Sequence, residues 1–158
     1  MSDFAVTWDL VRGRFLGALE GLTDEQLNRR LHKNALSIGE MAIHVAGVEI
    51  YFSYQLTGTP IEGEVARLAA AATDGVVNDK PFPFSVEEIT VSRLAEALEL
   101  GKAAVEPLIT NPDPYREVNI VSALGPVIDG TGAFARLAYH PAYHQAQVYL
   151  TRSDPDFN

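Results

Sequence analysis

The chain has 158 residues, 47% of them hydrophobic and 21% charged, which is typical of one globular domain and excludes a disordered or fibrous protein. Its formal net charge of −9 argues against the basic surface that nucleic-acid binding requires. The absence of cysteine excludes disulfides, thiolate metal ligands and a cysteine nucleophile. No signal-peptide pattern or membrane-length apolar run is present, so we expect a soluble cytoplasmic protein without membrane contact, forming a single domain over residues 1–158.

The first third of the chain predicts helices. Apolar residues between Phe4 and Leu22 recur at spacings of four and three, which predicts an amphipathic helix closed by Gly21. The stretch Thr23–Gln26 has the form of a capping box and predicts a short helical turn through Arg30.

A second capping box predicts the next long helix. Ser37 and Glu40 stand three residues apart at the start of an apolar pattern that runs to Thr57, and Gly58 supplies a stop. The segment that follows, up to Ser85, is rich in turn-forming residues, with room for a short helix within residues 63–75.

Two further helices complete the expected fold. One covers about Val91–Ile109 and begins at Thr90 or earlier, at the capping box Ser85–Glu88; the other covers about Thr131–Arg152. Between them, Val118–Val121 can be extended. Four long amphipathic helices without convincing strand pairs predict an all-α protein, a four-helix bundle with short additional helical turns.

The histidines suggest chemistry. His140 and His144 are four residues apart, so on a helix they share one face and can bind one divalent ion at about 2.0–2.1 Å. His44 falls on the predicted inward arc of its helix, whereas Glu49 lies off that arc. From spacing alone, a metal site and core histidines satisfied by carbonyl groups are equally good interpretations. His32 lies outside every apolar helical pattern of the chain, so we expect it at the surface.

Two segments resemble the DinB/YfiT-like superfamily. SIGEMAIHVAGVEIYF (residues 37–52) is similar to its second helix, and ARLAYHPAYHQAQVYL (residues 135–150) is similar to its last helix, with an H-x-x-x-H motif and a following glutamine. The resemblance covers the chain in length and helix order. It implies that His44, His140 and His144 hold a divalent metal, most often zinc or nickel, and leave coordination positions open.

Three neighbours of these histidines bear on the site. Arg136 and Gln147 fall within about 40° of the histidine pair on a helical wheel. We expect Arg136 to bind an anionic group of a substrate, or else to form a salt bridge, and Gln147 to orient a histidine or contact a ligand, or else to join two helices. Pro141 departs from the family pattern, and a kink there would tilt the two imidazole rings.

Two classes of function remain open. The resemblance implies a metal-dependent enzyme, such as a transferase, in which the site activates a low-molecular-weight thiol cosubstrate, or water, against a small electrophilic substrate. The alternative is a non-catalytic, stress-related helical dimer with a structural or vestigial metal. The resemblance also implies a homodimer.

Overall fold

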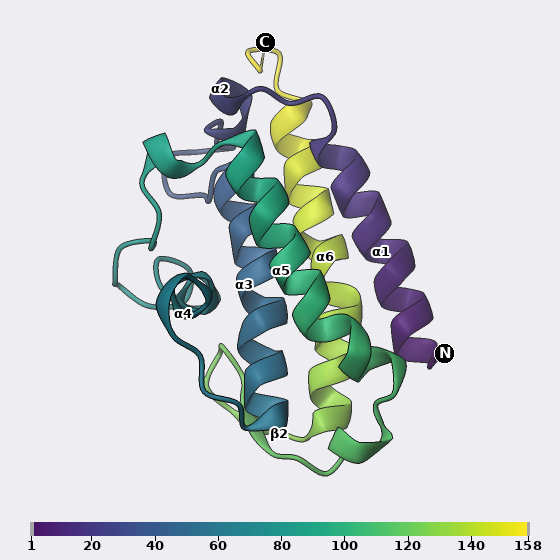
Figure 1. Cartoon of the computed structure of the whole chain (residues 1–158). Helices are drawn as coiled ribbons and strands as arrows, with labels where there is room; N and C mark the ends of the chain where they lie inside the picture. The colour runs from purple at the N-terminus through teal and green to yellow at the C-terminus, as the bar shows by residue number, and fades with distance from the viewer. Residues whose placement is uncertain (1, 158) are drawn as a thin grey trace.

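The computed structural model describes residues 2–157 and forms a bundle of four long helices, as predicted (Figure 1). Helices α1 and α6 run in one direction along the bundle, and α3 and α5 run in the opposite direction (Figure 1). Helix α3 packs against both α5 and α6, and α1 packs mainly against α6. The expected all-α fold is therefore confirmed. The bounds are α1 Asp3–Leu19, α3 Ile38–Thr57, α5 Val91–Thr110 and α6 Gly130–Arg152.

Short elements fill the connections. Helix α4 lies beside α3, on the opposite side from α1 (Figure 1). A two-stranded antiparallel hairpin, which pairs Ile120 with Ile128 and Val121 with Val127, precedes α6. Only the first of these strands lies within the segment expected to be extended. The remaining bounds are α2 Asp24–Leu27, α4 Gly63–Ala70, the 3₁₀ turns η1 Val86–Glu88 and η2 Asp113–Tyr115, β1 Ile120–Val121 and β2 Val127–Ile128.

Side-chain caps set the helix ends. At the start of α3, the Ser37 hydroxyl accepts from the Glu40 amide and the Glu40 carboxylate accepts from the Ser37 amide, the predicted capping box. Gly58 ends α3 with a φ of 69°, a left-handed conformation that glycine adopts without steric cost. The capping box at Ser85 precedes only the 3₁₀ turn η1. Helix α5 begins later, with Thr90 as its N-cap.

Helix α6 runs through Pro141 without interruption. Asp129 caps its first turn by accepting from the Gly132 amide at 2.7 Å, and the helix continues to Arg152. A proline at this position removes one backbone hydrogen bond within the helix. The buried Pro141 ring is nevertheless accommodated, and His140 and His144 stay on one face.

Helix α3 is central, with 16 of its 20 residues buried. A single inward arc therefore describes it poorly, and Glu49, although off that arc, is 2% exposed. Its carboxylate accepts from Arg12 Nε and from Trp8 Nε1, each at 2.9 Å, which ties α3 to α1. Burial of this carboxylate requires such partners, because an unpaired buried charge is costly. Within the described residues, none of the helices has the length and apolar character needed to cross a membrane.

Candidate metal centre

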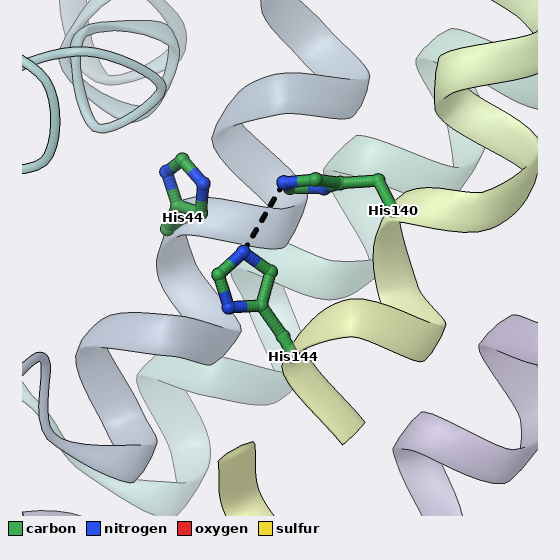
Figure 2. A group of neighbouring side chains, drawn as sticks. All are labelled: His44, His140 and His144. Carbon is green, nitrogen blue, oxygen red and sulfur yellow. Dashed lines mark hydrogen bonds between the residues drawn. The ribbon is translucent and has the colours of Figure 1, made fainter. Parts of the chain in front are cut away.

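Three histidines from two helices meet on the side of the bundle where α3 faces α6. His44 projects from the first half of α3, while His140 and His144 project from successive turns of α6, and the three rings converge (Figure 2). Ring centroids are 4.7–5.0 Å apart, and the ring planes meet at 66–79°. Each residue is 4% exposed. This is the set of three side chains that sequence reasoning singled out.

Hydrogen bonds fix which nitrogen of two rings faces the centre. His44 Nδ1 donates to the Ala71 carbonyl at 2.8 Å, and His144 Nδ1 donates to Gln147 Oε1 at 2.7 Å. Both rings therefore present Nε2 with its lone pair inward. The Nε2 atoms of His140 and His144 are 3.1 Å apart (Figure 2).

These positions fit a divalent ion. With one nitrogen taken from each ring, the three donor atoms lie within 4.8 Å of one another. Two nitrogens bound to one zinc ion at tetrahedral angles are roughly 3.3 Å apart, close to the separation across the His140–His144 pair. A bond from the second ring nitrogen to a carbonyl or amide is also the usual way in which metal-binding histidines are oriented.

A glycine lets the orienting carbonyl reach His44. Gly47, one turn after His44, faces the backbone at the end of α4, and a Cβ there would lie 2.4 Å from the Leu68 carbonyl oxygen. It would also lie 3.3 Å from the carbonyl carbon of Ala71. The missing side chain thus permits α4 and its C-terminal turn to approach α3 closely enough for the Ala71 carbonyl to bind the ring.

The environment keeps the imidazoles neutral. Burial lowers the pKa of His44 to about 4, and the hydrogen bond to Ala71 only partly offsets this effect. Burial is the main cause that lowers the pKa of His144 to about 3, and a second proton in the cluster would also be repelled by a protonated His44. The pKa of His140 also falls well below its usual value because of burial. Neutral rings at physiological pH are the form that binds metal.

No carboxylate completes the cluster. Among residues 2–157, these three histidines are the only group of three or more histidine, aspartate or glutamate side chains placed to share an ion. A structural zinc site usually has four protein ligands, whereas three ligands leave a position for water or substrate. The donor set therefore fits an ion with open coordination.

Two cavities reach the histidines. The first, which we call the Arg136 cavity, has a volume of about 360 Å³ and touches all three rings. The second, the Gln147 cavity, has a volume of about 340 Å³ and touches His144 from the side of the loop between α2 and α3. Tyr143 borders both cavities, and its ring stands edge-on to His144 at 5.0 Å.

Arg136 lines the cavity named after it. Its Nη1 donates to the Tyr139 hydroxyl at 3.3 Å, while its buried Nε has no hydrogen-bond partner within the described chain. No acidic side chain of residues 2–157 forms an ion pair with it. The salt bridge considered as an alternative is thus absent from the described structure.

The other predicted residues are also placed. Gln147 bonds His144 within α6 and does not bridge helices through that amide oxygen. His32 is exposed, as expected, and borders the Gln147 cavity. Sequence reasoning missed the Ala71 carbonyl, and it missed Tyr139, Tyr143 and the hairpin residue Leu124, which border the Arg136 cavity. Only Gly47 offered a signal, since a glycine inside a helix weakens it and so invites a packing explanation.

Comparison with known proteins identifies a family. No curated protein and no solved structure matches the chain significantly. The family model of the DinB superfamily matches residues 7–148, a range that includes α3 and the part of α6 that carries both of its histidines. The chain therefore belongs to the DinB superfamily.

Proposed function

We propose that this protein is a divalent-metal enzyme in which His44, His140 and His144 hold the ion, zinc or nickel, and an open face of the site reacts with a small molecule. The observation that carries the proposal is the convergence of three neutral imidazoles at the wall of an open cavity of about 360 Å³. Small-molecule sites occupy roughly 300–1,000 Å³, so this space suits a small substrate.

His44, His140 and His144 would hold the ion, which would supply a Lewis acid able to lower the pKa of a bound thiol or water molecule. The protein's own groups hold the geometry. The Ala71 carbonyl and the Gln147 amide keep the donor nitrogens of His44 and His144 turned to the centre.

A low-molecular-weight thiol is the preferred nucleophile in this proposal. The chain contains no cysteine, so a thiol must enter as a cosubstrate. The presence of two cavities at His144 supports a reaction between two separate small molecules. Water as the nucleophile would give a hydrolase with the same metal ligands.

The proposal is tested by metal analysis and turnover on matched histidine variants. His140→Ala removes one ligand, and His32→Ala removes an exposed histidine and serves as the control. We expect about one zinc or nickel ion per chain in the wild type and in His32→Ala, and much less in His140→Ala. Loaded wild-type protein should accelerate the consumption of a small thiol by an electrophile, or the hydrolysis of an ester.

Two results would contradict this function. Equal metal content in His140→Ala and the wild type would remove the proposed ligand set. One tightly bound ion with no thiol transfer and no hydrolysis across a broad substrate panel would instead favour the non-catalytic protein with a structural metal.

A further inference from the structure

We propose that the Arg136 cavity is a binding site for a small organic carboxylate with an apolar or aromatic body, whose carboxylate pairs with the Arg136 guanidinium. The proposal deepens the proposed function by naming the class of its electrophilic substrate, and in that respect rests on it. Binding of the carboxylate itself depends on Arg136 and the cavity wall.

Arg136 has unused hydrogen-bonding capacity. One terminal nitrogen, Nη1, is held by the Tyr139 hydroxyl, but Nε is shielded from water and has no partner within residues 2–157. A buried donor without a partner is destabilising, so a ligand oxygen that accepts from it recovers lost free energy. Tyr139, which holds Nη1, is 51% exposed and borders the cavity, so this side of the guanidinium lies at the rim rather than in the core.

A carboxylate matches this edge best. The guanidinium offers parallel N–H donors that pair with the two oxygens of a planar carboxylate. Arg136 is the only lysine or arginine that lines the cavity, and the described lining includes no acidic residue. A single cation suits a singly charged group, whereas a phosphate with two charges would be left with oxygens that lack donors.

The rest of the lining indicates the body of the ligand. Apart from Arg136 and the three histidines, the cavity is bordered by small aliphatic side chains and by Leu124, Tyr139 and Tyr143. Leu124 is 62% exposed and Tyr143 is 59% exposed, so large apolar surface stands open at the rim. Aromatic and aliphatic walls with one placed charge are typical of a site for an amphiphilic small molecule.

The helix sets the distance between the two recognition points. Arg136 precedes His140 by four residues on α6, so their Cβ atoms are neighbours on one face, about 5–6 Å apart. A carboxylate at Arg136 therefore places a carbon a few bonds away beside the histidine cluster. In a chain with a net charge of −9, this local positive charge is also what makes the cavity attractive to an anion.

Calorimetric binding of two isosteric probes tests the inference. Phenylacetate carries the carboxylate, and phenylacetamide has the same shape without the charge. Each is titrated into zinc-loaded and metal-free protein, for the wild type, Arg136→Gln and Arg136→Lys. We expect the wild type to bind phenylacetate at least tenfold more tightly than phenylacetamide, in both metal states, since hydrogen bonds to charged groups are the stronger ones.

The variants separate Arg136 from the metal. The preference for phenylacetate should disappear in Arg136→Gln and persist in part in Arg136→Lys, with thermal stability and zinc content unchanged. Equal affinity for the two probes in the wild type, or a preference that survives in Arg136→Gln, would overturn the inference. A preference that persists in metal-free protein while turnover fails would leave this site standing and remove only the proposed function.

Discussion

Replacing Gly47 by alanine tests whether the backbone behind His44 controls metal binding. The added Cβ would lie 2.4 Å from the Leu68 carbonyl oxygen, where ordinary contacts begin at 3.4 Å. Relief of this overlap requires a displacement of about 1 Å between α3 and the end of α4. That displacement carries the Ala71 carbonyl away from His44 Nδ1 and frees the ring to rotate.

Two effects on stability oppose each other in this variant. Overpacking costs about 1–3 kcal/mol, whereas alanine in place of glycine within a helix returns up to about 1 kcal/mol. The net loss of folding free energy therefore lies between about 0 and 3 kcal/mol. No comparable gain offsets the loss of metal affinity that we expect in Gly47→Ala. Loss of the bond that orients a ligand typically weakens binding by about 10–100-fold.

The assay is competitive zinc titration against a chelator, combined with urea unfolding of the metal-free protein. Gly101→Ala is the matched control, because its added Cβ overlaps a neighbour to a similar degree, at 2.5 Å from Glu49 Oε2 and 3.0 Å from Ala46 Cα. The three atoms nearest to this Cβ belong to Glu49 and Ala46, and none of them belongs to Ala71. We expect Gly101→Ala to lose stability and keep zinc affinity within about twofold. Unchanged zinc affinity in Gly47→Ala, or equal losses in both variants, would refute the reasoning.

Three further outcomes are expected. Glu49→Gln leaves the Arg12 charge buried without its counter-ion, so urea unfolding should show a loss of about 3–5 kcal/mol, and a loss below about 1 kcal/mol would contradict the pairing. In metal-free protein, the unfolded chain gains protons below pH 6.5 while His44 and His144 stay neutral down to pH about 4 and about 3. Unfolding free energy should therefore fall on acidification by about 1.4 kcal/mol per pH unit for each imidazole, more steeply than in a variant with phenylalanine at residue 44. Gly13→Ala, with open space around its Cβ, should raise the melting temperature through a gain of about 0.5–1 kcal/mol, and a decrease would refute this.

The helices and the histidine cluster were accessible from sequence for physical reasons. Caps such as the Ser37–Glu40 box and Gly58 act within one helical turn, so the residue types at these positions predict helix ends well. His140 and His144 needed only helical periodicity to be placed on one face. The inward position of His44 on its helix makes it the candidate third ligand, and the family resemblance supports the same residue.

Long-range pairing was not accessible in the same way. Glu49 lies off the apolar arc that the sequence predicts, yet α3 is enclosed on nearly every side and the carboxylate meets Arg12 of another helix. The Ala71 carbonyl carries no side-chain signature at all, since any residue offers that oxygen. Such contacts depend on how helices approach one another, which local patterns do not encode.

The position of the histidines along the chain has a thermodynamic consequence. His44 and His140 are separated by about 96 residues, and they lie on helices that run in opposite directions (Figure 1). An ion bound to both would act as a reversible cross-link that closes most of the polypeptide into a loop, and it would do so only in the native state. Metal supply would then tune the stability of the folded protein, because each tenfold rise in free ion above its dissociation constant adds about 1.4 kcal/mol to the free energy of unfolding.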